Sequence, residues 1–515
     1  MSSASSVRTG DYGGAVGGRI KRPGKRIGRV VHTVFREERK GPIVKKAFYI
    51  AGEWREGTVY APLHAPYSGE RIAEIPQADE RTVDQAIASA QEAAYAMRRM
   101  PAHQRAAILE KISRLFEERL EEAARIIALE AGKPIKTARG EVIRTIQTYK
   151  FAAEEAKRIH GETVPLDAAI GGEGRVAYTV REPLGVIGAI TPFNFPMNLV
   201  AHKVGPALAA GNAVVLKPAS QTPLSAFFLA ELAEAAGLPP GALNVVTGSG
   251  GTVGDKLVAD PRIKAITFTG SPAVGIGIRS RAGLKRVTLE LGSNSAVIVD
   301  RDVNLAAVVP RCVFGAFAYS GQVCISVQRI YVVKEMYQAF LEAFVSETRK
   351  LRGGDPLSEE TDYSAMISPK ETERALAWIE EAKQRGASVA CGGEVEGRVL
   401  QPTILTGVPA DAKVSCQEVF GPVVLVNPVD SVEEAIALVN DSRYGLQAGL
   451  YTNNLSLALQ AADELHVGGV MINDVPTFRV DHMPYGGVKE SGMGREGIRY
   501  AIEELTELKL VAIKR

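Results

Sequence analysis

Residues 185–217 read GVIGAITPFNFPMNLVAHKVGPALAAGNAVVLK. Two short runs rich in apolar and β-branched residues, 185–190 and 213–217, lie on either side of the helix-like stretch 197–210. A strand, a helix and a second strand at this spacing are typical of a parallel βαβ unit. Three more β-branched runs follow, at 243–246, 265–269 and 286–290. The alternation predicts an α/β fold built on a doubly wound parallel sheet.

The segments before and directly after this unit are also patterned. Apolar residues recur at helical spacing through 81–160, which predicts long helices. Residues 161–182 alternate between polar and apolar around Gly171-Gly172, which predicts a hairpin. Residues 222–236 form a further predicted helix, with Thr222 as its cap and Pro223 at its first position.

A second α/β segment is expected after Asn304. Its predicted strands lie near 329–333, 423–426 and 468–472. The C-terminal residues 505–513 alternate again and predict an edge strand.

The chain has 515 residues, too many for one compact core, so two or three domains are expected. Hydrophobic residues make up 46% and charged residues 23%, the ordinary composition of a soluble globular protein. No apolar run reaches the roughly 20 residues that span a bilayer, and the N-terminus lacks the hydrophobic stretch of a secretion signal. The sequence therefore predicts a cytoplasmic protein with no membrane partner.

Charge is distributed unevenly although the net charge is only +2. Residues 1–46 hold twelve Lys or Arg against three acidic residues, a local charge of +9, which leaves −7 for the other 469 residues. An acidic body argues against a nucleic-acid partner. Residues 1–44 are rich in Gly, Ser and Arg and lack apolar periodicity, so we expect a flexible basic tail. A nucleic-acid or membrane tether, or a translation start placed too far upstream, are the alternatives.

The four cysteines are too few and too widely spaced for a disulfide framework. The sequence contains no Cys-x-x-Cys pair, and its seven histidines form no His-Glu-x-x-His motif. We therefore expect no metal. The remaining question is whether one cysteine is a nucleophile.

Three residues stand out as candidates for chemistry. Cys324 has small neighbours in YSGQVCI, whereas Cys312 lies in an apolar run typical of a buried core cysteine. Glu290 closes an apolar strand, where burial should raise the pKa of its carboxyl, as a general base near neutrality needs. Asn194 lies between two prolines in TPFNFP, as an oxyanion donor or as a turn residue.

Two Gly-rich turns could hold a phosphate group. GSGG at 248–251 precedes a helical pattern, and GSPAVG at 270–275 follows a predicted strand and opens another helix. The N-terminus of a helix after a strand presents free N–H groups to an anion, although glycine after a strand is often only turn chemistry.

Seven segments in order closely resemble the aldehyde dehydrogenase superfamily over about residues 45–515. They are TPFNFP (191–196), KPAS (217–220), FTGS (268–271), LELG (289–292), GQVC (321–324), EVFGP (418–422) and PYGGVKESG (484–492).

The resemblance implies oxidation of an aldehyde to its acid by a nicotinamide cofactor. Cys324 would attack the aldehyde, Asn194 and the Cys324 N–H would hold the oxyanion, and Glu290 would activate the water that hydrolyses the thioester. The resemblance also implies a set of cofactor-binding residues: Thr191, Phe193, Lys217, Ser220, Gly250, Gly270, Ser271, Glu418 and Phe420.

Two positions bear on the substrate. Val323 precedes the nucleophile, where non-phosphorylating glyceraldehyde-3-phosphate dehydrogenases carry an Arg that binds the substrate phosphate. Arg479, however, lies in TFRVDHMP, which resembles the loop where those enzymes and archaeal lactaldehyde dehydrogenases place a second Arg. We expect Arg479 to meet an anionic or hydroxylated substrate tail, with a surface salt bridge as the alternative.

Ser220 stands where NAD-preferring relatives commonly carry Glu, so we expect NADP to be accepted at least as well as NAD. The rival functions are a coenzyme-A-acylating dehydrogenase, which the presence of Glu290 argues against, and a non-catalytic protein that retains the fold.

The resemblance also predicts the domain organisation. A dinucleotide-binding domain would comprise 45–160 and 183–291, and an α/β catalytic domain 292–480. A small β ribbon from 161–182 and 481–515 would join subunits into a homodimer or homotetramer.

Overall fold

Five parallel strands form the centre of an eight-stranded sheet, in the order β24-β12-β11-β8-β9-β10-β2-β3. The computed structural model describes residues 44–515, so the tail expected at 1–44 lies almost wholly outside the described residues. The strands of this first sheet are β2 (Phe48–Ile50), β3 (Glu53–Arg55), β8 (Val186–Ile190), β9 (Ala213–Lys217), β10 (Leu243–Val245), β11 (Ile263–Thr269), β12 (Arg286–Glu290) and β24 (Gly492–Met493).

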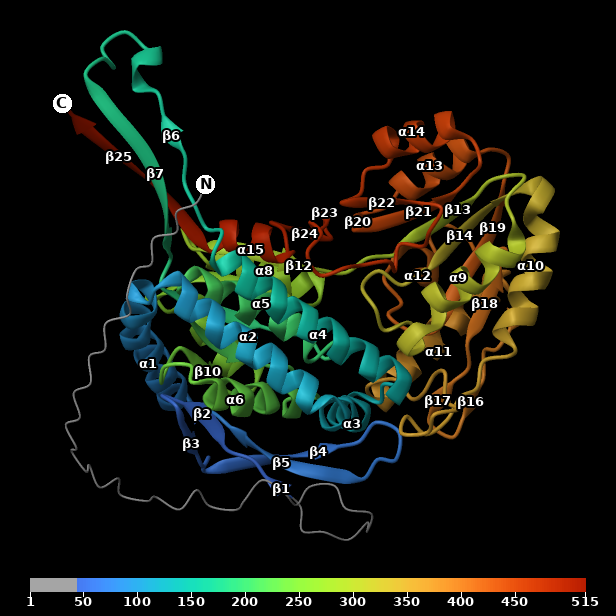
Figure 1. Cartoon of the computed structure of the whole chain (residues 1–515). Coiled ribbons are helices and arrows are strands. Elements are labelled where there is room, and N and C mark those ends of the chain that lie inside the picture. The colour runs from blue at the N-terminus through green and yellow to red at the C-terminus, as the bar shows by residue number, and fades with distance from the viewer. Residues whose placement is uncertain (1–43) are drawn as a thin grey trace, which may run out of the picture. The chain divides into compact units, whose positions relative to one another are not determined.

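Helices cover both faces of this sheet, which confirms the doubly wound fold. Helices α5 and α6 pack on one face because right-handed crossovers join β8, β9 and β10, and α1 and α7 pack on the other. Figure 1 shows α2 and α4 as a further layer outside α5. The helices are α1 (Glu80–Arg99), α2 (Ala102–Glu118), α3 (Leu120–Ala131), α4 (Ile135–Ala156), α5 (Asn198–Ala210), α6 (Leu224–Ala236), α7 (Asp255–Ala259), α8 (Pro272–Arg281) and α15 (Ile498–Glu504).

The predicted cap of the helix over 222–236 is wrong. Helix α6 begins at Leu224 and has no side-chain cap of its own, and the hydroxyl of Thr222 is buried without a partner. Its first N–H groups instead donate to the buried carboxyl of Glu130 in α3, at 2.7 Å from Leu224 and 2.9 Å from Ser225. A distant residue thus replaces the local cap.

A second, seven-stranded sheet has the order β15-β18-β19-β14-β13-β21-β22. Alternate residues of β13 enter different cores: Val297 packs toward α9 and α10, and Ile298 toward α13 and α14. The elements are β13 (Ala296–Val299), α9 (Leu305–Phe317), β14 (Arg329–Val333), α10 (Lys334–Thr348), α11 (Pro369–Gln384), β15 (Ser388–Cys391), β18 (Thr403–Thr406), α12 (Lys413–Cys416), β19 (Val423–Val429), α13 (Val432–Asn440), β21 (Gln447–Tyr451), α14 (Leu455–Glu464) and β22 (Gly469–Ile472).

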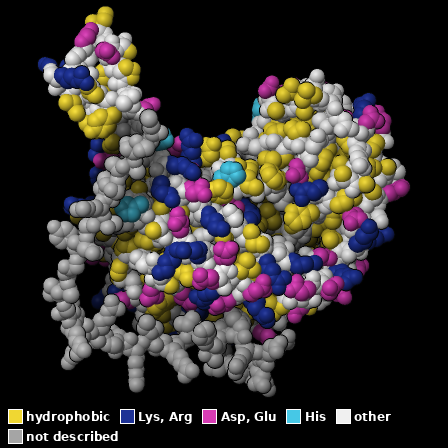
Figure 2. All heavy atoms as spheres, in the orientation of Figure 1, with side chains coloured by type: hydrophobic (Ala, Val, Ile, Leu, Met, Phe, Trp, Pro, Cys, Tyr) yellow, Lys and Arg dark blue, Asp and Glu magenta, His cyan; other side chains and the backbone are white. Residues whose placement is uncertain are grey.

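A three-stranded sheet of order β25-β7-β6 projects from the rest of the described chain (Figure 1). Strand β7 (Arg175–Pro183) pairs with only two residues of β6 (Thr163–Val164), but along its whole length with the C-terminal β25 (Thr506–Lys514). The predicted edge strand is confirmed, and its main partner is the segment predicted as a hairpin. Hydrophobic side chains gather on this projection in Figure 2.

Short strands complete the described chain. They form three further small sheets: β1 (Val44–Lys45), β5 (Arg71–Gln77) and β4 (Val59–His64); β16 (Val395–Glu396) and β17 (Val399–Leu400); and β20 (Tyr444–Gly445) and β23 (Val488–Lys489).

Candidate active site

Polar side chains at the carboxyl ends of the parallel strands lack partners. The hydroxyls of Thr191, after β8, and Thr269, which ends β11, are buried without a hydrogen bond. Lys217, which ends β9, is 7% exposed; its one recorded hydrogen bond, to the Pro218 carbonyl, measures 3.4 Å, and no carboxylate of the described residues pairs with it. Burial lowers the pKa of this ammonium group.

These unsatisfied groups fit a polar ligand, because buried polar groups without partners are costly. They surround the point where the chain order reverses between β8 and β11, the usual ligand site of an open α/β sheet. The predicted cofactor residues Ser220, Gly250 and Ser271 are exposed on the turns that follow β9, β10 and β11, and Gly270 is half-buried. Ser271 precedes α8 and makes no capping hydrogen bond with its side chain.

Glu418, Phe420 and Phe193 form a second part of the site. The rings of Phe193 and Phe420 meet edge to face with centroids 5.7 Å apart. Glu418 accepts a hydrogen bond from the backbone of Ser293 at 2.9 Å, and burial raises the pKa of its carboxyl to about 7. A Cβ on Gly292 would lie 2.5 Å from a Glu418 oxygen, so any other residue at this position would collide with the carboxylate.

A strained turn presents Cys324. Three successive residues before it, Tyr319, Ser320 and Gly321, have φ of 49°, 53° and 67°, in the left-handed region. Tyr319 and Ser320 are anchored by side-chain hydrogen bonds of 2.7 Å to the carbonyls of Ala131 and Ser364. Backbone strain held by its surroundings is a feature of functional sites. Cys324 itself is half-buried, whereas Cys312 is fully buried in the core.

Asn194 lies beside this turn. Its side-chain Nδ2 donates to the carbonyl of Gln322 at 3.1 Å, and its Oδ1 is buried without a partner. The buried ammonium of Lys133 donates to the backbone carbonyl of Asn194 at 2.7 Å and pairs with Glu141. The side-chain amide is therefore bonded to the backbone two residues before Cys324 in the sequence.

Glu290 ends β12 with both carboxyl oxygens buried and unpartnered. Burial, and then the nearby charge of Glu496, raise the pKa of Glu290 well above its ordinary value. Gly486 abuts the carboxyl, since a Cβ there would lie 3.1 Å from Oε1. The Asn194 amide is thus bonded to the turn of Cys324, and the unpaired carboxyl of Glu290 lies near enough to raise the pKa of the thiol. A thiol, an amide and a carboxyl are a set suited to acyl chemistry.

Comparison with known proteins agrees with this geometry. The model of the aldehyde dehydrogenase family matches residues 54–511. The chain belongs to the aldehyde dehydrogenase family. It is 50% identical to 3-sulfolactaldehyde dehydrogenase of Priestia aryabhattai over 465 residues, covering 90% of this chain and 97% of that protein. This enzyme is accordingly an oxidoreductase that acts on aldehydes.

Two solved structures are similar. Aldehyde dehydrogenase 21 of Physcomitrella patens, in complex with the reaction product succinate, matches with a TM-score of 0.90 and 40% identity, covering 92% of this chain and 98% of that one. Glyceraldehyde-3-phosphate dehydrogenase GapN of Methanocaldococcus jannaschii, complexed with NADP, matches with a TM-score of 0.86 and 40% identity, covering 89% and 100%. Both support the α/β fold, and the second, together with the family, supports the use of NAD(P).

Sequence reasoning gave no role to three residues of this dehydrogenase's site. The Tyr485 hydroxyl lies 2.9 Å from the sulfur of Cys324. Lys203 and Glu496 form a fully buried ion pair at 2.8 Å near Glu290, and Lys203 then Arg479 lower the pKa of Glu496 although burial alone would raise it. A lysine inside the apolar run 197–210 was the signal for this pair.

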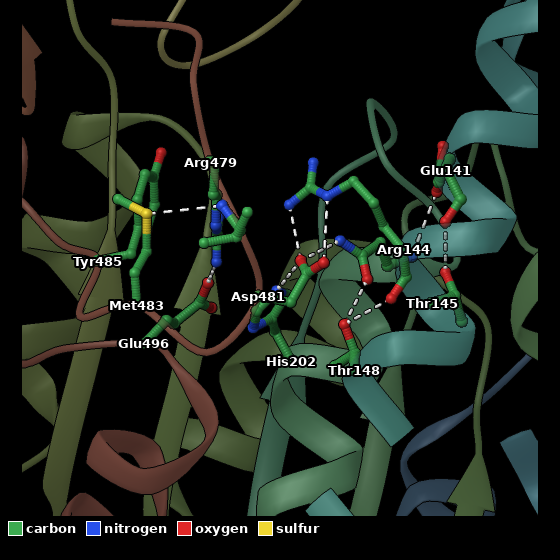
Figure 3. A network of polar contacts seen from close by, with 12 residues as sticks. Glu141, Arg144, Thr145, Thr148, His202, Arg479, Asp481, Met483, Tyr485 and Glu496 are labelled. Carbon is green, nitrogen blue, oxygen red and sulfur yellow. Dashed lines mark hydrogen bonds and ion pairs between the residues drawn. The ribbon is translucent and has the colours of Figure 1, made fainter. Parts of the chain in front are cut away.

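Arg479 forms an ion pair, but not the surface salt bridge considered from the sequence. Its side chain is 5% exposed, and Nη2 donates to Glu496 at 2.9 Å. Figure 3 shows Arg479 between Glu496 and Tyr485, while the neighbouring Asp481 is held by Arg144 and His202.

Two other kinds of site are absent from the part of the chain that the structure describes. Among residues 44–515, no cluster of His, Cys, Asp and Glu is placed to hold a metal ion. No helix in the same range is both long and apolar enough to cross a membrane.

Proposed function

We propose that this dehydrogenase oxidises a small aldehyde with an anionic or hydroxylated tail to the carboxylic acid, with Cys324 as the nucleophile. The observation that carries the proposal is the hydrogen bond that holds the Asn194 amide to the turn of Cys324, with the unpaired carboxyl of Glu290 near enough to raise the pKa of the thiol. A cytoplasmic location and a homodimer or homotetramer are part of the same proposal.

In the proposed reaction the Cys324 sulfur, as the thiolate, adds to the aldehyde carbon, and the carbonyl oxygen becomes an oxyanion. The second N–H of the Asn194 Nδ2 and the backbone N–H of Cys324 stabilise that oxygen. Loss of hydride from the carbon leaves a thioester on the sulfur. Glu290, as the carboxylate, takes a proton from water, the hydroxide adds to the thioester, and the Cys324 sulfur leaves as the acid forms.

The nicotinamide cofactor, when bound, supplies the hydride acceptor. Residues for holding it are those at the strand ends and across from them: Thr191, Phe193, Lys217, Ser220, Gly250, Gly270, Ser271, Glu418 and Phe420. Lys217 would hold the hydroxyls of the adenosine ribose, as its lack of a carboxylate partner allows. Glu418 would accept from the ribose nearest the nicotinamide, and Phe420 would pack near that ring.

Arg479 is the proposed contact for the substrate's tail. Its Nε is buried without a hydrogen-bond partner, so one donor of the guanidinium is free. The relatives named above are described with a sulfonated aldehyde, a dicarboxylate product and a phosphorylated aldehyde, all of which are anionic at neutral pH. An Arg donor suits each of these groups.

The test is a steady-state assay of the full chain with NAD and NADP. 3-Sulfolactaldehyde and glyceraldehyde 3-phosphate should give a higher kcat/KM than propanal, a neutral aldehyde of similar length. Cys324→Ala should lower turnover by roughly three orders of magnitude or more, because no other group forms the covalent intermediate. Cys416→Ala, at an exposed cysteine, serves as the matched control.

Substantial turnover by Cys324→Ala would refute the assignment of the nucleophile. Acceleration by coenzyme A, with release of an acyl thioester rather than the acid, would identify the acylating alternative. A preference for propanal would refute the anionic substrate class.

A further inference from the structure

Tyr485 is fixed against the sulfur of Cys324. Its side chain is buried, and the 2.9 Å contact with Cys324 Sγ is the hydrogen bond that the described residues offer to its hydroxyl. Its backbone is locked by two hydrogen bonds with Glu496, of 3.0 Å and 2.7 Å. The ring therefore has little freedom to turn away from the thiol.

Arg479 packs against the face of the Tyr485 ring. The guanidinium carbon is 3.6 Å from the centroid of the Tyr485 ring, and Nη2 donates to Glu496 at 2.9 Å. Lys203 holds the second oxygen of Glu496 at 2.8 Å. Figure 3 shows the resulting order, with Arg479 between Tyr485 and Glu496.

A cation on the ring face strengthens the phenol as a hydrogen-bond donor, because positive charge nearby favours negative charge on the phenol oxygen. Burial raises the pKa of Tyr485, so the hydroxyl keeps its proton and acts as donor. The acceptor is then the sulfur, which accepts best as the thiolate.

The other charged groups around Cys324 oppose its ionisation. Burial raises the pKa of the thiol to about 11, and the carboxyls of Glu418 and Glu290 add to the rise. Only the hydrogen bond from Tyr485 and the charge of Arg479 act in the opposite direction among the groups that face the sulfur. A nucleophilic thiol needs such an opposing influence at neutral pH.

We propose that Tyr485 is a catalytic residue that donates a hydrogen bond to the Cys324 thiolate, and that Arg479 is a positioning residue that holds and polarises the Tyr485 ring. The inference rests on the proposed function in taking Cys324 as the nucleophile. It gives the face of the guanidinium a task separate from that of the free Nε, the proposed donor to the substrate's tail.

The experiment measures the pH dependence of Cys324 alkylation by iodoacetamide, in the full-length enzyme without aldehyde or cofactor. Loss of activity is followed with time, and mass spectrometry locates the label. Cys324→Ala gives the background from the other cysteines. Tyr149→Phe is the matched control, since Tyr149 is also buried and its hydroxyl has no partner.

Tyr485→Phe should move the midpoint of the alkylation profile up by about one pH unit, and slow alkylation at pH 7 about tenfold, because the thiolate loses a charge-assisted donor. Arg479→Met should shift the midpoint in the same direction by less. The double variant should shift it by less than the sum of the two single shifts, since Arg479 acts on the thiol partly through the ring and partly by its own charge. Arg479→Lys should raise the midpoint by less than Arg479→Met but should not restore the wild-type value. Lysine keeps the positive charge but has no planar group to stack on the Tyr485 ring.

A profile of Tyr485→Phe that superimposes on that of the wild type, while labelling of Cys324 still abolishes turnover, would overturn the inference. Labelling of Cys324 that leaves turnover intact would instead refute the proposed function. If Tyr485→Phe does not fold, the shift between Arg479→Met and the wild type decides, and its absence would likewise overturn the inference.

Discussion

In the proposed reaction, the protonation state of Glu290 sets the rate of thioester hydrolysis. Burial and the charge of Glu496 hold the pKa of Glu290 well above its usual range, so the carboxyl carries a proton until the pH rises through that raised value. The basic form then grows with pH. Thioester hydrolysis should therefore accelerate with rising pH, and Glu290→Gln should remove this dependence and slow steady-state turnover by about a hundredfold.

Rapid-mixing measurements separate hydride transfer from thioester hydrolysis. Glu290→Gln should still give a first-turnover burst of reduced cofactor, because hydride transfer does not need the base. Loss of the burst together with the steady state would contradict this division of roles.

Ser220 is the residue at which cofactor choice is expected to be set. It is exposed on the turn after β9, and Lys217 carries an ammonium group three residues earlier. A serine does not repel a 2′-phosphate as a carboxylate would, so NADP should be used at least as well as NAD. Ser220→Glu should shift the ratio of kcat/KM toward NAD by tenfold or more, or about 1.4 kcal/mol.

Gln221→Glu is the matched control, since it adds the same charge one exposed position further along the turn. The two cofactors are compared at equal aldehyde concentration. A wild type that strongly prefers NAD, or a ratio unmoved by Ser220→Glu, would show that another residue selects the cofactor.

Within the first sheet, the sequence predicts the parallel strands, which are largely buried. Strands β8, β9 and β12 are recognisable because a parallel strand buried on both faces is a short run of β-branched residues. The half-exposed β4 and β5 went unpredicted, since their composition is mixed and their partner is distant. The cap of α6 could not be predicted either, because Glu130 acts across 94 residues of sequence.

The candidate site also contains residues that the sequence predicts and residues that it does not. Cys324, Asn194 and Glu290 lie in recognisable motifs, and the structure brings the surroundings of the first two together through one hydrogen bond. The contact of Tyr485 with Cys324 joins residues 161 positions apart. No local sequence pattern predicts a contact between such distant residues, so this contact is known only from the structure.

Asp481 ties the loop before Tyr485 to helices α4 and α5. Burial alone would raise its pKa, but the hydrogen bond from His202 and the charge of Arg144 outweigh burial and lower it. A carboxyl with a lowered pKa stabilises the fold above its unfolded pKa of about 3.9, and the contribution is lost progressively as the pH falls from that value through the lower pKa of the folded state.

Asp481→Asn should accordingly lower the free energy of unfolding by about 3 kcal/mol at pH 7, with the difference from wild type shrinking below about pH 4. Asp474→Asn is the control, because the Arg311–Asp474 pair is more exposed and should contribute at most about 1 kcal/mol. Denaturant unfolding between pH 3 and pH 8 provides the measurement. A difference that stays constant across this range would contradict the assigned pKa shift.

At the scale of the whole described chain, the projecting sheet β25-β7-β6 has an unpaired edge and exposed apolar side chains. Strand β25 pairs with β7 on one side, and no described strand pairs with its other edge. Leu508 and Leu510 are 53% and 52% exposed on one face, and the other face exposes Val176, Tyr178 and Ile513. Free edges and exposed apolar faces promote association, so natural proteins cover them.

A second copy of this chain is the proposed cover, giving a homodimer or homotetramer. Leu508→Lys with Leu510→Lys should reduce the mass in solution to that of a smaller assembly, because lysines on the covered face cannot be buried without partners. Leu284→Lys is the control, at a leucine that is fully exposed elsewhere. Sedimentation at several protein concentrations measures the mass. A monomeric wild type, or a double variant with unchanged mass, would show that this sheet does not join subunits.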